Sequence, residues 1–138
     1  MENVFQVDLA LVQPSQLYIS SEKLARVMAT FDPEDPETLA PIPVKELGGQ
    51  LVFMDGHTRA LAAHLAGYIS VPAYRETDEL NWVAYEICVD WCIKEGIFTI
   101  ADLAKRVVSP IDYQTRWLDR CREMHKRLGI FKERDQVD

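Results

Sequence analysis

A five-residue segment, Asp55-Gly56-His57-Thr58-Arg59, brings together residue types that can bind phosphate. It follows the apolar run at residues 51–54, and a helical pattern begins near His57. The first N–H groups of a helix lack carbonyl partners within the helix and carry the positive end of its dipole, so an anion is stabilised there. Gly56 allows a tight turn and the close approach of a ligand to the backbone.

Each side chain of the segment suits a role beside a phosphate. Arg59 offers a planar fork of donors, and Thr58 adds a hydroxyl. His57 can donate a hydrogen bond or exchange a proton near neutral pH. Asp55 can orient one of these groups or help to hold Mg²⁺, which prefers carboxylate and phosphate oxygens. We therefore assign Asp55 and His57 as candidate catalytic residues, and 56–59 as the phosphate-binding residues.

A structural explanation also exists for each residue alone. Asp55 could cap the helix, and Gly56 could serve only the turn. Arg59 could pair with a surface acid, and His57 could be exposed to solvent. Four such residue types within five positions favour the functional interpretation.

Strands and helices alternate around this segment. Alternating apolar residues predict a strand over 4–12, and Ser20-Ser21 is typical of a helix N-cap. Four prolines predict an irregular, mobile loop over 32–43. Further elements are predicted as strands at 42–47 and 50–54 joined by Gly48-Gly49, a helix at 57–66 ending at Gly67, and a strand at 71–74.

Only helices are predicted beyond residue 78. The first spans 79–95, with a buried stripe expected at Leu80, Val83, Ile87 and Trp91. Thr99 and Asp102 resemble a capping box, and Ser109-Pro110 is typical of a helix start. The predicted order is β-α-β-β-α-β followed by three helices. We expect an α/β (α+β) fold with a mixed sheet, in which a core at 1–77 packs as one unit with a helical extension at 78–138.

Composition limits the class of protein. The chain has 138 residues, 48% of them hydrophobic, which suffices for one core. It shows neither a long apolar run nor a basic-then-apolar leader, so we expect no membrane span and a place in the cytoplasm. The three cysteines, at 88, 92 and 121, are expected to be reduced thiols. Cys88 and Cys92 stand one helical turn apart and are interpreted as small buried residues.

Charge is distributed unevenly along the chain. The net charge is −7, yet residues 99–134 contain nine Lys/Arg against five Asp/Glu. A helix-turn-helix over 99–128 is therefore an alternative functional unit, with Gln114, Arg116 and Arg120 contacting DNA. The acids on the same helix favour the other interpretation, a helical cap with a solvated face.

The segment at 54–63, with Leu65-Ala66-Gly67 and Val71-Pro72, resembles the core motif of the ParB/sulfiredoxin-like superfamily. That motif is a strand, a Gly-x-x-Arg turn, an alanine-rich helix, a glycine, and a strand that opens with Val-Pro. Residues 41–44, Pro-Ile-Pro-Val, also fit the pattern. The resemblance covers about residues 8–76. It implies the fold more specifically than it implies an activity.

The branches of that superfamily differ at this turn. Sulfiredoxins have a cysteine where this chain has His57, so reduction of a sulfinic acid is not expected. Chromosome-partitioning ParB proteins use a Gly-Glu-Arg-Arg run and a later arginine with CTP, whereas this chain has His57-Thr58-Arg59 and Leu61. The Asp-Gly-His-x-Arg form is most similar to the free-serine kinases of this fold. Their general base is a glutamate, and Glu22 stands near the equivalent place after a shift of one residue.

The resemblance implies a protein that binds a nucleotide (ATP, ADP or CTP) with Mg²⁺ and transfers a phosphoryl group to a small hydroxyl acceptor such as serine. Glu22 could instead be an acid in the first turn of a helix, where the dipole favours it. The alternative function is a non-enzymatic ParB-like regulator that binds DNA, and a homodimer is compatible with either. In a third alternative, the fold serves protein contacts only.

Overall fold

A mixed four-stranded sheet forms the base of the molecule. The computed structural model describes residues 3–130. Its strands are β1 (Phe5–Asp8), β3 (Ile42–Leu47), β4 (Gln50–Phe53) and β5 (Ser70–Arg75), in the order β1-β5-β3-β4. β3 and β5 run parallel, whereas the β1–β5 and β3–β4 pairs are antiparallel. With its helices, this sheet confirms the predicted α+β class with a helical C-terminal part.

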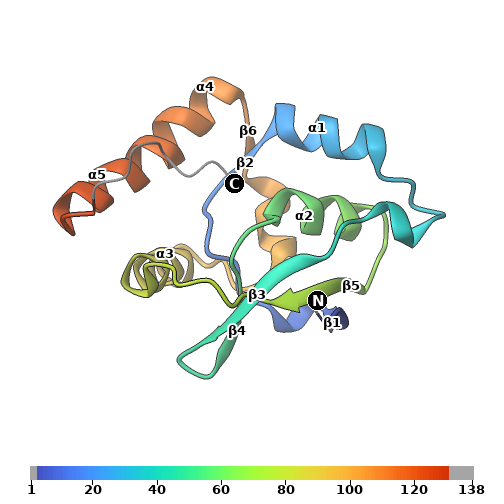
Figure 1. The fold of residues 1–138 in the computed structure, drawn as a ribbon. Helices are drawn as coiled ribbons and strands as arrows, with labels where there is room; N and C mark the ends of the chain where they lie inside the picture. The colour runs from blue at the N-terminus through green and yellow to red at the C-terminus, as the bar shows by residue number, and fades with distance from the viewer. Residues whose placement is uncertain (1–2, 131–138) are drawn as a thin grey trace.

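Two helices stack above the sheet. α1 (Ser21–Thr30) packs against α2 (His57–Leu65), and Figure 1 shows α2 lying between α1 and the sheet. Apolar side chains from all these elements form one buried cluster, in which Phe53, Ile42 and Leu61 are fully buried. This burial is the main stabilising term, and it fixes where α2 begins relative to the end of β4.

The hairpin and helix boundaries around α2 follow the sequence closely. Gly48 and Gly49 join β3 to β4 with φ of +59° and +80°. Two successive positive φ angles suit the tight turns that match the twist of paired strands. Gly67, with φ of +91°, ends the helix region as predicted.

The first predicted strand is too long. β1 ends at Asp8, whose carboxylate accepts a hydrogen bond from the Ala10 N–H at 2.9 Å and caps the 3-10 helix η1 (Leu9–Leu11). As a result Leu11 is exposed rather than buried. The chain returns to the sheet at Gln13, which forms an isolated parallel bridge with Val52.

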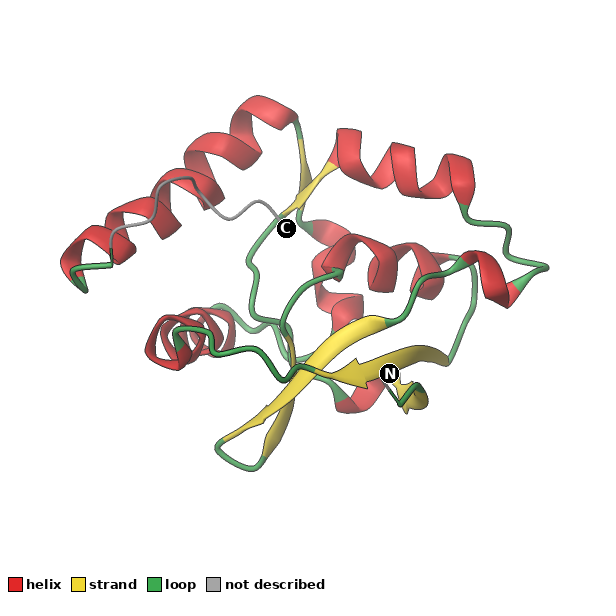
Figure 2. Cartoon of the chain, viewed as in Figure 1, coloured by secondary structure: helices red, strands yellow, loops and turns green. Residues whose placement is uncertain are grey.

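The prediction of helices alone beyond residue 78 is wrong. β6 (Val107–Val108) pairs in parallel with β2 (Ile19–Ser20), and the two form a separate small sheet. Figure 2 shows this pair between α1 and the helix that begins at Pro110. Two residues are too few to produce a period-two pattern in a sequence, so only the partner strand defines β6.

The C-terminal part also contains α3 (Trp82–Lys94), the 3-10 helix η3 (Ile100–Lys105) and one long helix. That long helix consists of α4 (Pro110–Tyr113), the π-helical η4 (Gln114–Leu118) and α5 (Asp119–Arg127), which Figure 2 draws as continuous. We call these three elements the C-terminal helix. Its start at Ser109-Pro110 and the capping box of Thr99 and Asp102 are confirmed.

α3 faces the core one position away from the predicted stripe. Ala84, Cys88 and Cys92 are its buried residues, while Val83 is 54% exposed. Apolar residues lie on several sides of α3, so the sequence does not define a single buried stripe. The small side chains are the ones that contact the core. This packing confirms that Cys88 and Cys92 are small buried residues.

The proline-rich stretch contains a short 3-10 helix, η2 (Pro36–Thr38). The Thr38 hydroxyl accepts a hydrogen bond from the Asp32 N–H at 2.8 Å and donates to the Asp35 carbonyl at 2.7 Å. Leu39 is buried in the core immediately after it.

Within the described residues, no helix is long and apolar enough to cross a membrane.

The three thiols differ in their surroundings, and the difference can be measured. Burial raises the pKa of the Cys92 thiol to about 12, with smaller contributions from the neighbouring Cys88 and Glu95. Cys88 is buried as well, while Cys121 is partly exposed. We expect a disulfide reagent at pH 8 to modify Cys121 first, because the thiolate is the reacting form and access is required. The fast phase should disappear in Cys121→Ser. A fast phase that persists in that variant would contradict the packing described for α3.

Candidate functional site

The Asp55-Gly56 turn joins β4 to α2 in a conformation that requires glycine. Gly56 is the N-cap of α2 with φ of +73° and ψ of +21°, in the left-handed region. Its N–H donates to Oδ1 of Asp55 at 2.7 Å. Glycine brings no side chain to cap the helix. The first N–H groups of α2 therefore have no hydrogen-bonding partner on the N-cap side chain, and an anion can bind to such N–H groups.

Arg59 fastens this turn to the segment that enters β3. Its Nη1 donates to the carbonyls of Ala40 at 3.1 Å and Pro41 at 2.9 Å. The other terminal nitrogen, Nη2, lies against Gly56, where an added Cβ would stand only 2.8 Å from it. Arg59, which the sequence predicts as a phosphate-binding residue, therefore has a structural role as well, because it holds the proline-rich segment beside the turn.

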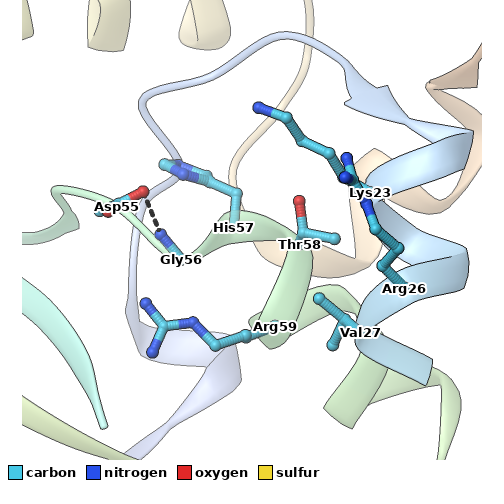
Figure 3. A pocket seen from close by; sticks show the side chains of 8 residues that line it. All are labelled: Lys23, Arg26, Val27, Asp55, Gly56, His57, Thr58 and Arg59. Carbon is cyan, nitrogen blue, oxygen red and sulfur yellow. Dashed lines mark hydrogen bonds between the residues drawn. The ribbon is translucent and has the colours of Figure 1, made fainter. Parts of the chain in front are cut away.

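A pocket of about 320 Å³ opens over the start of α2. The segment at 55–59 forms one wall, and Lys23, Arg26 and Val27 of α1 form the other. Figure 3 shows Lys23 reaching from α1 over Thr58, with Arg59 on the opposite side of the turn. Three cationic side chains against one carboxylate give this pocket a positive character in a chain whose net charge is −7. We call it the phosphate pocket, after the ligand that the sequence predicts for residues 56–59.

Lys23 and Arg26 are the residues that sequence reasoning missed. They stand three apart on α1, so they lie on one face of that helix, after the N-cap Ser20. Nothing in their spacing indicates which other element this face meets. The contact between α1 and α2 supplies that information.

His57 is 2% exposed, and its ring holds a neighbouring loop. Its Nε2 accepts a hydrogen bond from the Ser15 N–H at 3.0 Å, so that nitrogen carries no proton in this arrangement. The Ser15 hydroxyl donates to the Phe53 carbonyl at 2.7 Å. The His57 and Phe53 rings meet edge to face at 5.7 Å. Proton exchange through Nε2 would require this hydrogen bond to break.

The other predicted site residues divide into two groups. Thr58 and Asp55 line the phosphate pocket. Glu22 is not among its lining residues, although its neighbour Lys23 is. The side chain of Glu22 is 64% exposed and pairs with Arg26 at 3.4 Å. The structure therefore places Asp55, rather than Glu22, at the positive end of α2.

Magnesium is the metal that the sequence implies for this site. Among residues 3–130, no three His, Cys, Asp or Glu side chains gather closely enough to hold a metal ion on their own. Mg²⁺ is usually bound by one or two carboxylates together with the phosphates of a substrate and water. Asp55 in the phosphate pocket fits that pattern as the single protein carboxylate.

The residues predicted for DNA contact lie on the C-terminal helix, and two of them are engaged within the protein. Gln114 donates to Asp119 at 2.8 Å. Arg120 pairs with Glu95 at 3.2 Å and lies 4.1 Å from the centre of the Trp91 ring. The Arg116 guanidinium lies 6.0 Å from the Tyr18 ring. DNA binding by Arg120 would require it to give up both of its contacts.

No model of a known protein family matches this chain, and no curated protein matches its sequence. Among solved structures, similarity is found to the C-terminally truncated chromosome-partitioning protein ParB from Caulobacter crescentus, complexed with CTP-gamma-S. The identity is 21% and the TM-score 0.44, over 67% of this chain and 53% of that one. Protein Atu1540 from Agrobacterium tumefaciens is similar at 12% identity and a TM-score of 0.44, over 71% of this chain and 51% of that one. The matched part of this chain thus spans about half the length of each structure.

The close contact at Gly56 leads to a prediction on stability. Gly67→Ala has open space around its Cβ, so it should cost about 1–2 kcal/mol of the free energy of unfolding, from the left-handed backbone alone. Gly56→Ala meets Arg59 and also Ile42 at 3.0 Å, so it should cost a further ~1–3 kcal/mol. Urea unfolding of the two variants measures the difference. Equal losses would show that Gly56 serves the turn only.

Proposed function

We propose that this chain binds a phosphate-bearing ligand, in particular a nucleotide, in the phosphate pocket. The observation that carries the proposal is the presence of three cationic side chains, from two helices, in the lining of the pocket at the N-terminus of α2. The glycine cap brings no side chain to that helix end, and the dipole favours a negative charge there. The resemblance of residues 54–72 to the ParB/sulfiredoxin-like motif supports the same site.

Each group would have a distinct part in binding. The first N–H groups of α2 and the Thr58 hydroxyl would donate to phosphate oxygens. Lys23 and Arg26 would neutralise the charge from the α1 side, and Arg59 would do so from beneath the turn. A volume of about 320 Å³ accommodates more than one phosphate group, so a diphosphate suits it better than a single phosphate.

Calorimetric titration tests this binding with inorganic pyrophosphate, ATP, ADP and CTP in turn. Arg26→Gln should weaken the binding of pyrophosphate about tenfold, because it removes one charge-assisted hydrogen bond. Arg75→Gln is the matched control, since Arg75 is also largely exposed and paired with a glutamate, Glu46, but lies outside the pocket. The affinity should also fall as salt is added.

Two results would contradict the proposal. One is the absence of binding to all four compounds by the unaltered chain. The other is an equal loss of affinity in Arg26→Gln and Arg75→Gln, which would indicate a general effect of surface charge. Binding of pyrophosphate as tight as that of the nucleotides would limit the proposal to phosphate recognition.

We propose in addition that the bound nucleotide donates a phosphoryl group to a small hydroxyl acceptor such as serine, with Mg²⁺. The acceptor oxygen would form a new bond to the terminal phosphorus, and the bond from that phosphorus to the bridging oxygen of the nucleotide would break. The hydroxyl proton would pass to Asp55, the carboxylate that lines the pocket. Mg²⁺, bound mainly through phosphate oxygens and water beside Asp55, would supply charge neutralisation.

Phosphorus NMR with Mg²⁺, nucleotide and L-serine tests the transfer. A new phosphomonoester signal should appear with serine and should be lost in Asp55→Asn, whose amide oxygen can still accept from the Gly56 N–H. Glu22→Gln should retain the signal, because Glu22 lies outside the pocket. Loss in Glu22→Gln with retention in Asp55→Asn would return the role of base to Glu22. Unchanged spectra would overturn the transfer and leave nucleotide binding to be judged by the titrations.

A further inference from the structure

A second, larger cavity lies beside the phosphate pocket. Its volume is about 690 Å³, within the range of sites for small organic molecules. One side is formed by the start of α3 and the residues before it, and the other by the C-terminal helix. Figure 1 shows α3 and α5 on either side of this region. Asp55 and His57 line both cavities, so they form the wall between them. We call the larger cavity the α3 groove.

Part of the lining of the α3 groove is apolar and aromatic. Trp117 of the C-terminal helix, Tyr85 of α3 and Tyr74 of β5 are its aromatic residues. Met54 and Cys88 add apolar surface. Such a lining favours the apolar body of a ligand over an inorganic ion.

The wall on the C-terminal helix contains the π-helical turn. Gln114, Trp117 and Leu118 belong to η4 and all line the groove. π-turns within α-helices occur frequently at functional sites, because they redirect side chains at an energetic cost. Contacts outside the groove hold this wall in place. Trp117 meets Trp91 edge to face at 6.2 Å, and the Arg120 guanidinium lies 4.1 Å from the Trp91 ring centre.

The charges of the α3 groove are opposite in sign to those of the phosphate pocket. Its carboxylates are Asp55, Glu76, Asp78 and Glu79. Arg122 is the one Lys or Arg in its lining, and its guanidinium pairs with Asp119 at 3.0 Å. His57 and His125 are the two histidines of its lining. An excess of carboxylates disfavours an anionic ligand and favours a cationic one.

We propose that the α3 groove binds an organic cation, a molecule with an ammonium group on an apolar body. Aromatic faces and carboxylates together are the groups that recognise such cations, by cation–π attraction and by charge. The proposal does not depend on phosphate binding, because it rests on a different set of lining residues. The two sites would meet at Asp55 and His57, so one molecule could occupy both if it carried an amine and a phosphate.

A pair of probes of equal shape separates charge from apolar contact. Choline carries a trimethylammonium group, and 3,3-dimethylbutan-1-ol has the same shape without the charge. Both are titrated into the isotopically labelled chain, and binding is followed by NMR at the indole N–H of Trp117. We expect choline to bind at least about fivefold more tightly than the alcohol. Shifts should be confined to residues of the groove.

Two exposed glutamates provide matched variants. Glu79→Gln removes a carboxylate from the groove and should weaken choline binding about threefold, whereas Glu86→Gln, on the exposed side of α3, should not. The proposal is overturned if neither probe binds at millimolar concentration, or if the alcohol binds as well as choline. It is also overturned if the two variants lose affinity equally. If the chain fails to bind pyrophosphate in the calorimetric titrations described above, the outcomes with choline and the alcohol still decide this proposal.

Discussion

The hydrogen bonds from Arg59 to the carbonyls of Ala40 and Pro41 connect the three parts on which the site depends. They hold the first turn of α2, the proline-rich segment and the start of β3 in one arrangement. Gly56 is required for the same reason, because any side chain there would meet the arginine that makes these bonds. The hydrogen bonds of Arg59 thus position the start of α2 at the pocket and also stabilise the fold. A substitution of Arg59 would therefore affect both the pocket and the stability of the protein.

The local elements near the site were largely predictable, because each depends on neighbouring residues. Ser20 as an N-cap, the two-glycine hairpin and the helix start at His57 all follow from backbone chemistry over a few positions. What failed depended on distant partners. β6 exists only because β2 lies beside it, and the elements packed against α3 decide that Cys88 and Cys92, rather than the predicted stripe, are buried.

The same distinction applies to the candidate site. The segment at 55–59 could be recognised from residue types alone, but Lys23 and Arg26 could not, since no sequence pattern shows that α1 meets α2 at this end. Glu22 illustrates the converse. A carboxylate one residue away from Lys23 looks equivalent in the sequence, yet a rotation of about 100° around the helix axis separates the two side chains. The structure then places Lys23, and not Glu22, in the pocket.

The π-helical turn at Gln114–Leu118 lets the C-terminal helix contain one extra residue without turning the part that follows it. A π-turn holds one residue more than the α-helical turn it replaces, so the residues after it keep their side of the helix. If one residue were deleted there, the helix could continue as a regular α-helix. The side chains from Cys121 onward would then keep their orientation toward α3, because the lost residue and the lost π-turn compensate each other. Relatives of this chain that lack one residue in this turn would therefore share its fold, and the wall of the groove on the C-terminal helix would change mainly at Gln114–Leu118.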